Sequence, residues 1–140
     1  MPGAGNYLWK KRIAQYEMRK FNYQDSFLAP ILSGCFLLFS DEVYQKVGGF
    51  DERFFLYLED VDLSRRMAQS HLNVHWPSVA ITHDYQKSSY HSLRPLLYHI
   101  ISAIKYFNKW GWIFDRERKQ LNRTTLNQKK PYSSNLTSQR

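Results

Sequence analysis

The stretch GGFDERFFLYLEDVDLSRR, residues Gly48–Arg66, carries most of the information in this chain. Three carboxylates, Glu59, Asp60 and Asp62, follow an aromatic and apolar run, and a basic pair comes within one further helical turn. Acids at the start of a helix are typical of N-capping and of favourable contact with the helix dipole. The three acids also repel one another, so at least one should have a raised pKa and could accept a proton from a hydroxyl group. Spacing alone favours the capping interpretation and leaves the general base open.

The residues around this stretch predict short strands and helices in alternation. Ser40 is a plausible N-cap, and Gly48 with Gly49 ends the helix that Ser40 starts. The expected elements are a weak helix within Tyr7–Phe21, a buried strand at Leu32–Phe39, a helix at Asp41–Val47, a strand or extended segment at Phe54–Leu58, a helix at Asp60–Gln69, and short strands at Leu72–Trp76 and Val79–Thr82.

The C-terminal part contains the clearest helical pattern. Apolar residues recur at spacings of three and four from Leu93 to Phe107, which predicts an amphipathic helix. Its apolar stripe could pack on the domain, or could lie in a membrane interface with Trp110 and Trp112 among the lipid headgroups. The expected organisation is a lead segment at 1–28, a central unit at 29–90, a helical region at 91–121 and a basic disordered tail at 122–140.

The composition limits the possible partners. The net charge is +8, and residues 85–140 hold eleven Lys or Arg against two Asp or Glu. This balance indicates an acidic partner such as anionic lipid, nucleic acid or a phosphorylated substrate, but no base-stacking or groove-reading motif supports nucleic acid. No apolar stretch reaches 18 residues and the N-terminus has no apolar signal core, so we expect a cytoplasmic protein without a spanning helix. The single cysteine, Cys35, is expected to be a small buried apolar residue.

Two features could bind a metal ion. Asp60-Val61-Asp62 has the D-x-D form that chelates a divalent cation on a nucleotide diphosphate, and hard oxygen ligands suit Mg²⁺ or Mn²⁺. His83 ends the apolar run VAIT, where a neutral imidazole could enter a cleft and bind a metal. The alternative for Asp60-Val61-Asp62 is an ordinary acidic helix start, and the alternative for His83 is a hydrogen-bonded structural histidine. Sequence spacing alone favours the alternative in each case.

A longer pattern resembles a known family. The segment SGCFLLFSDEVYQKVGGFDERFFLYLEDVDLSRRM, followed by WPSVAITH, is similar to the C-terminal half of family 2 glycosyltransferases. The likeness is to bacterial rhamnosyltransferase-type enzymes that build O-antigen, other lipopolysaccharide parts and further surface polysaccharides. The matching positions are Gly48, Gly49, Phe50, Asp51, Phe54, Phe55, Tyr57, Glu59, Asp60, Asp62, Leu63, Arg66, Pro77 and His83.

The resemblance implies the acceptor-side half of a GT-A type α/β fold, with a short mixed sheet, flanking helices and then the amphipathic helix. It implies an inverting transfer from a nucleotide-sugar donor to a polyprenyl-linked glycan acceptor at the inner face of the cytoplasmic membrane. Asp60 would be the general base, and Glu59, also catalytic, and Asp62 would orient it or help to shape the acceptor site. His83 would help to hold the divalent metal, Mg²⁺ or Mn²⁺, on the donor diphosphate. The acceptor site, or its support, would use Asp62, Arg66 and Gly34.

The same resemblance implies that a nucleotide-binding half, which carries the family's own metal-binding D-x-D, precedes this region. We expect the chain to be inactive without that half. The alternatives are an active partner of a separately encoded half, a non-enzymatic module that binds membrane surfaces through its basic region, and a gene remnant without function. Rhamnose as the donor sugar is an expectation from the likeness alone.

Overall fold

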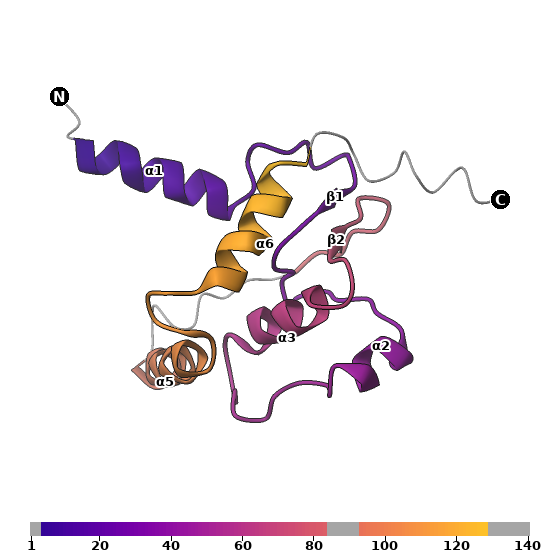
Figure 1. Cartoon of the computed structure of the whole chain (residues 1–140), viewed down its shortest axis with the longest axis vertical. Coiled ribbons are helices and arrows are strands. Elements are labelled where there is room, and N and C mark those ends of the chain that lie inside the picture. Colours follow the sequence, from indigo (N-terminus) through magenta and orange to yellow (C-terminus); the bar gives the residue numbers. More distant parts are fainter. Residues whose placement is uncertain (1–3, 84–92, 129–140) are drawn as a thin grey trace.

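The structure, a computed structural model, describes residues 4–83 and 93–128. Helices dominate, and a small sheet joins two distant parts of the chain (Figure 1). Mixed α and β structure is therefore confirmed. The elements are α1 (Ala4–Tyr16), β1 (Phe27–Leu28), α2 (Asp41–Lys46), α3 (Glu59–Ala68), β2 (Val74–His75), α5 (Leu93–Trp110) and α6 (Arg116–Leu126).

The sheet consists of β1 and β2 in antiparallel register, with Phe27 opposite His75 and Leu28 opposite Val74. The side-chain amide of Gln128 donates to the carbonyl of Leu28 and accepts from its N–H, each at 2.8 Å. This amide satisfies the outer edge of β1 as a third strand would. A mixed sheet is thus wrong for the described residues, since their two strands are antiparallel.

The expected strand at Leu32–Phe39 is also wrong. Its start is held by side chains, because Leu32 exchanges hydrogen bonds with the Ser64 hydroxyl and Gly34 N–H donates to Asp60. No strand in the described part of the chain pairs with this segment. Without a neighbouring strand some of its apolar side chains stay in solvent: Leu38 is 87% exposed and Phe36 48%, and Cys35, expected to be buried, is exposed as well.

The helices on either side of the glycine pair form as predicted. The Ser40 hydroxyl accepts from Val43 N–H and caps α2. Gly48 and Gly49 follow with φ of +79° and +66°, the left-handed conformation that ends a helix. The expected strand at Phe54–Leu58 is wrong, and the expected strand at Val79–Thr82 is irregular too.

The chain enters α3 through a strained turn. Tyr57 and Leu58 have φ of +69° and +65°, which is uncommon for residues with a side chain. Leu58 stands at the N-cap position of α3 and makes no side-chain capping bond. The turn is held from α5, where the Ser102 hydroxyl donates to Leu56 carbonyl at 2.7 Å. Strain of this kind is frequent near functional sites, and here it sets the position of the carboxylates that follow.

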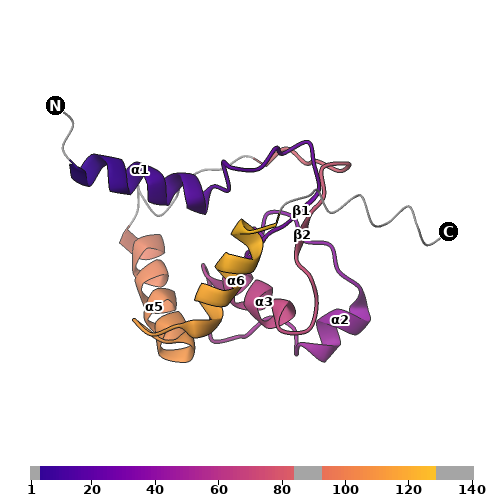
Figure 2. The same cartoon turned by 45° about the horizontal axis from the view of Figure 1, so that its top comes forward.

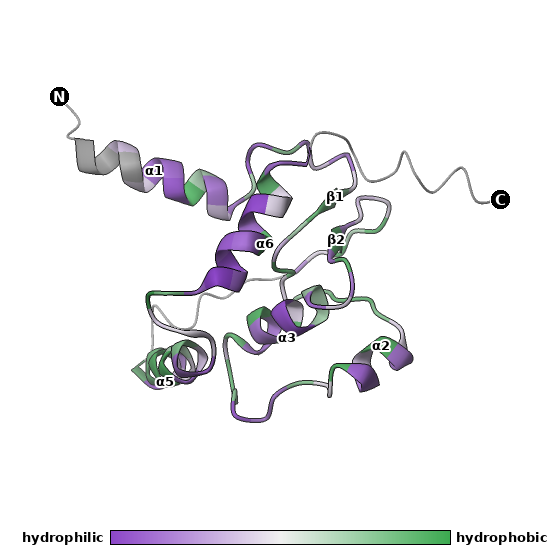
Figure 3. Cartoon of the chain, in the orientation of Figure 1, coloured by the Kyte–Doolittle hydropathy of each residue, from purple (hydrophilic) through white to green (hydrophobic). Residues whose placement is uncertain are grey.

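Helix α5 is amphipathic as predicted, but its polar side faces the protein. Ser102 and Tyr106 are its buried residues, and Lys109 lies 2.8 Å from the Asp51 carboxylate. Hydrogen bonds from Arg53, with help from Lys109, hold the pKa of Asp51 well below its ordinary value. The apolar stripe faces solvent, and its exposed members are Leu93, Leu96, Leu97, Ile100, Ile101 and Ile104. In Figure 3, α5 carries both hydrophobic and hydrophilic colours, whereas α6 is largely hydrophilic.

The buried core is small and is centred on α3. Leu63 is fully buried, and Met67, Phe27, Phe54 and Tyr106 join it from α3, β1, the turn before α3 and α5. Helix α6 begins at Asp115, whose carboxylate accepts from Arg118 N–H as an N-cap. Because α6 continues to Leu126, the expected disorder from residue 122 is wrong for 122–126, while residues 129–140 lie outside the described residues. The boundaries of the four expected segments stay predictions.

The N-terminal helix packs against the end of α6. Both views place the C-terminal end of α1 beside α6 (Figures 1 and 2). The ammonium of Lys20, just beyond α1, donates to Leu126 carbonyl at the end of α6. The weak helix expected within Tyr7–Phe21 therefore exists as Ala4–Tyr16, and it forms one wall of the cavity described next.

Candidate active site

Asp60 is the second residue of α3, and both of its carboxylate oxygens accept a backbone hydrogen bond. Oδ2 accepts from Gly34 N–H and Oδ1 from Val61 N–H, each at 2.8 Å. A Cβ at position 34 would lie only 3.1 Å from the Asp60 Cβ, so glycine is what permits this close approach. The structure thus brings the predicted base and one predicted support residue into direct contact.

Asp60 also lines a cavity of about 530 Å³, which we name the α1–α6 cavity. Its walls come from the end of α1, the loop after β1, the start of α3 and one face of α6. Gln15, Ser33 and Asn122 contribute polar groups, and Ile31 and Leu121 contribute apolar surface. A volume of this size is within the range of small-molecule sites.

Glu59 is the member of the acidic cluster whose pKa is raised. Burial is the main cause, and the negative charge of neighbouring Asp60 adds to it. Its Oε2 atom is buried and has no hydrogen-bond partner among residues 4–83 and 93–128. The sequence argument that crowding raises one of the three pKa values is therefore correct, although desolvation contributes more than repulsion.

Asp62 is fully buried and receives donors from two helices. Its carboxylate accepts from Arg66 Nε at 2.8 Å and from Trp110 Nε1 at 2.7 Å, and Lys109 Nζ lies 2.7 Å away. Arg66 in turn donates to the carbonyls of Val47 and Gly49, which ties the end of α2 to α3. Neither Asp62 nor Arg66 is among the residues that line the α1–α6 cavity. Their contacts join α3 to α5 and to the end of α2, and a role in supporting the acceptor site stays a prediction.

Arg65 is the centre of a buried network that the sequence did not reveal. Its guanidinium donates to both oxygens of Asp115, at 2.6 and 2.9 Å, and to Tyr106 Oη at 2.9 Å, and it stacks 4.0 Å from the Trp110 ring. Burial, the largest single influence, acts to raise the pKa of Asp115, but the hydrogen bonds from Arg65 and Arg118 and the positive charges of both arginines together outweigh it, and the pKa is lowered. Arg65 and Asp115 lie fifty positions apart, so no local pattern could have paired them.

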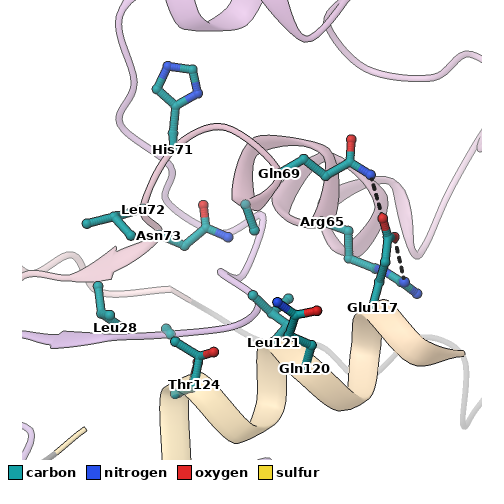
Figure 4. Close-up of a pocket in the computed structure, with 13 residues that line it drawn as sticks. Leu28, Arg65, Gln69, His71, Leu72, Asn73, Glu117, Gln120, Leu121 and Thr124 are labelled. Carbon is teal, nitrogen blue, oxygen red and sulfur yellow. Dashed lines mark hydrogen bonds and ion pairs between the residues drawn. The ribbon is translucent and has the colours of Figure 1, made fainter.

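A second cavity, of about 480 Å³, lies between α3, the sheet and α6 (Figure 4). In this close-up Glu117 reaches toward both Arg65 and Gln69. Glu117 accepts from Gln69 Nε2 at 3.1 Å and from Arg65 at 3.4 Å. Asp60 is not part of this lining. The buried charge in this cavity is that of Arg65, which is already paired with Asp115. The α1–α6 cavity is therefore the better candidate for a catalytic site.

The described residues do not form a metal site by themselves. Within residues 4–83 and 93–128, no group of three or more His, Cys, Asp or Glu side chains could hold a metal ion. Both Asp60 oxygens accept from backbone N–H groups, and Asp62 is buried among cations. His83 is exposed, and its role as a metal ligand stays a prediction.

Comparison with known sequences identifies the family of this chain. Residues 12–92 match the family described as the N-terminal domain of galactosyltransferase. Because the match covers more than half of the chain, the chain belongs to this family of glycosyltransferase domains. The match includes Asp60, Gly34, Arg66 and His83 and ends at the residue before α5.

Two curated relatives share a shorter segment. N-acetylglucosaminyl-diphospho-decaprenol L-rhamnosyltransferase from Mycobacterium tuberculosis, in strains CDC 1551 / Oshkosh and ATCC 25618 / H37Rv, is 47% identical over 53 residues. That segment is 37% of this chain and 17% of each relative, so the chain matches a small part of those enzymes. No solved structure matches the chain.

Proposed function

We propose that this chain forms the acceptor-side half of an inverting glycosyltransferase of GT-A type, with Asp60 as the general base. The observation that carries the proposal is the position of Asp60, which is fixed by Gly34 and faces a cavity large enough for a sugar. Membership of a glycosyltransferase family supports the reaction class. Likeness to a rhamnosyltransferase supports rhamnose as the transferred sugar. Surface polysaccharide, including lipopolysaccharide O-antigen, is the product class that we propose.

In this reaction the acceptor hydroxyl oxygen attacks the anomeric carbon of the nucleotide-sugar, and the bond from that carbon to the diphosphate breaks. Asp60 accepts the hydroxyl proton as the new carbon–oxygen bond forms. The N–H groups of Gly34 and Val61 hold the carboxylate in one orientation, so no reorganisation is needed at that moment. Glu59, whose pKa is raised, lies directly before Asp60 and contributes to its electrostatic environment.

The relatives support a class of acceptor for this proposal, and the donor is part of the proposal. A rhamnosyltransferase that acts on N-acetylglucosaminyl-diphospho-decaprenol supports a glycan on a polyprenyl diphosphate as the acceptor here. A nucleotide-sugar supplies the transferred group, and we place its binding in a nucleotide-binding half outside this chain. The divalent metal expected on the donor, with His83 as its ligand from this chain, remains part of the proposal, but we assign no step to it.

The transfer proposal is tested by supplying a nucleotide-binding half, a labelled nucleotide-sugar and a polyprenyl diphosphate glycan to the chain. Asp60→Asn should abolish transfer, because the amide cannot accept the proton, while the shape of the site is kept. Asp41→Asn is the matched control, since Asp41 also opens a helix but is exposed on α2. Transfer that survives Asp60→Asn, or no transfer by the wild type in any pairing, would contradict the proposal.

The outward stripe of α5 supports contact with an anionic membrane surface. Described residues contain no helix long and apolar enough to cross a membrane. Trp112, Ile113 and Phe114 extend the exposed apolar surface beyond α5, and Phe114 is 88% exposed. Arg116 and Lys119 follow at once on α6. Apolar side chains beside cations are typical of a surface that lies in the headgroup region, where a polyprenyl-linked acceptor would be reached.

Vesicle flotation tests the membrane contact. The chain should float with vesicles that contain anionic phosphatidylglycerol, and less so as salt is raised. The double variant Leu97→Gln and Ile101→Gln should lose flotation. The matched control, Leu72→Gln and Val79→Gln, removes two exposed apolar side chains away from α5 and should float normally. Equal loss in both double variants would refute contact through α5 and favour nonspecific adsorption.

A further inference from the structure

The α1–α6 cavity contains two arginines that the proposed transfer step does not use. Arg12 reaches it from α1 and Arg118 from α6, while Asp60 lines it from α3. The three side chains come from elements far apart in the sequence that meet around one space of about 530 Å³. A carboxylate on one wall and guanidinium groups on two others suit a ligand that carries both a hydroxyl and a strong anion.

The third arginine of the lining, Arg65, is neutralised by its own network. Both oxygens of Asp115 accept from Arg65, at 2.6 and 2.9 Å, and Arg65 is buried. Arg65 also lies 3.4 Å from Glu117, so two carboxylates balance its charge. Arg118 Nε lies 3.9 Å from Asp115, beyond hydrogen-bond distance, and the Arg118 side chain is 40% exposed. Arg118 and the exposed Arg12 therefore place two positive charges in the lining of the cavity, against the one carboxylate of Asp60.

We propose that Arg12 and Arg118 bind a diphosphate group, and specifically the diphosphate of the lipid-linked acceptor. The proposal rests on the proposed function, because it names the acceptor group that the same cavity would hold. Guanidinium groups present paired N–H donors that match phosphate oxygens, and such charge-assisted bonds are among the strongest in proteins. With the diphosphate held between α1 and α6, the adjoining sugar would occupy the rest of the cavity, whose lining includes Ser33, Asn122 and Asp60.

A diphosphate could also come from the nucleotide donor, so the probes must separate the two sources. Calorimetric titration of the full chain with inorganic pyrophosphate measures the shared chemistry. Geranyl diphosphate carries a lipid and no nucleoside, whereas uridine diphosphate carries a nucleoside and no lipid. We expect pyrophosphate and geranyl diphosphate to bind, and uridine diphosphate to bind no more tightly than pyrophosphate. Tighter binding of uridine diphosphate would assign the cavity to the donor and overturn the proposal.

Charge-matched variants test the two arginines. Arg12→Gln and Arg118→Gln should each weaken pyrophosphate binding by about tenfold or more, as expected for loss of a charge-assisted contact. Lys11→Gln and Arg123→Gln remove the same charge from other exposed positions on α1 and α6, which are not in the lining, and should change binding by less than about twofold. Equal weakening in all four variants would mean nonspecific attraction and would overturn the site, as would no binding by the wild type.

Binding and transfer give separate readings. Asp60→Asn should keep or strengthen pyrophosphate binding, because it removes a negative charge from the wall, although it should abolish transfer. Failure of transfer with intact binding by Arg12 and Arg118 would therefore count against the proposed reaction alone. Loss of pyrophosphate binding in Asp60→Asn, with unfolding unchanged, would contradict the division of roles proposed for this cavity.

Discussion

Helices α3 and α5 use their polar and apolar side chains in opposite ways. Helix α3 buries Asp62, Ser64 and Arg65 together with Leu63, so charged groups sit inside the protein. Helix α5 turns its serine, tyrosine and lysines toward α3 and the turn before it, and leaves its leucines and isoleucines in solvent. Ion pairs and hydrogen bonds thus join these two helices, and apolar surface remains for something else to cover.

This comparison of α3 and α5 distinguishes residues that hold the fold together from residues that could contact a ligand or a surface. Charges that are fully paired inside α3, such as Asp62 and Arg65, hold helices together. Asp60, one turn away, has its oxygens oriented by backbone donors and faces a cavity. The apolar stripe of α5 is largely exposed, and we infer that it contacts a surface outside the chain. The variants below test this division.

The largest expected effect is at Arg65. Arg65→Met should lower the free energy of unfolding by about 3–5 kcal/mol, because it leaves the buried carboxylate of Asp115 without its counter-charge. Urea denaturation measures the loss, and Arg116→Met, an exposed arginine on the same helix as Asp115, should change stability by less than about 0.5 kcal/mol. Adding Asp115→Asn to Arg65→Met should recover part of the stability. A loss below about 1 kcal/mol for Arg65→Met would mean that the network is not formed.

Two leucines give the next contrast. Leu63→Ala on α3 should cost about 2–5 kcal/mol, because Leu63 is fully buried and its removal leaves a cavity. Leu97→Ala on α5 should change stability by less than about 0.5 kcal/mol, since Leu97 is 55% exposed. Thermal and urea unfolding of both variants provide the comparison. Similar losses at the two positions would show that the stripe of α5 is packed inside the protein.

Two glycines separate the geometry of the site from backbone strain. Gly34→Ala places a methyl group 3.1 Å from Asp60 Cβ and should cost about 1–3 kcal/mol while displacing the base. Gly48→Ala meets no atom within 4 Å but has a φ of +79°, so it should cost about 1 kcal/mol without moving Asp60. In the reconstituted transfer assay only Gly34→Ala should reduce the rate. An equal loss of rate in both variants would argue that stability, and not the placement of Asp60, limits transfer.

The smallest effect concerns pH. Burial raises the pKa of Glu59 above its ordinary value of 4.5, so the folded state binds a proton more readily than the unfolded state. Stability should therefore fall as pH rises from about 4.5 through the folded pKa. Glu59→Gln should remove this fall, whereas Glu42→Gln on the exposed face of α2 should keep it. Urea midpoints measured across pH 4–7 would contradict the assignment if Glu59→Gln kept the slope of the wild type.

Short-range sequence patterns predicted a large part of this structure. Contacts between residues far apart in the sequence could not be predicted from such patterns. Ser40 and the glycine pair defined α2 correctly, because capping depends on residues a few positions apart. The stripe from Leu93 identified α5, but a periodic pattern shows only that two faces exist and not which face meets the protein. The strand expected at Leu32–Phe39 needed a neighbouring strand, which the described residues do not supply.

The same limit applies to the site. Asp60 and Gly34 were predicted from a motif, and the structure places them in contact. Arg12 and Arg118 were not singled out, because one lies in a weakly patterned helix and the other in a charged run, and only the fold brings them to Asp60. A basic residue whose neighbours in space come from three helices carries no signal in its own stretch of sequence.

The opposite burial of apolar side chains on α3 and α5 can be measured directly by thiol labelling. In a Cys35→Ser background, Leu97→Cys should react with a thiol reagent almost as fast as the denatured chain. Leu63→Cys should react at least about 100-fold more slowly than Leu97→Cys, because the thiol at position 63 is reached only when α3 opens. Equal rates at the two positions in the folded protein would contradict the account, since α5 would then hide its apolar stripe or α3 would not form the interior.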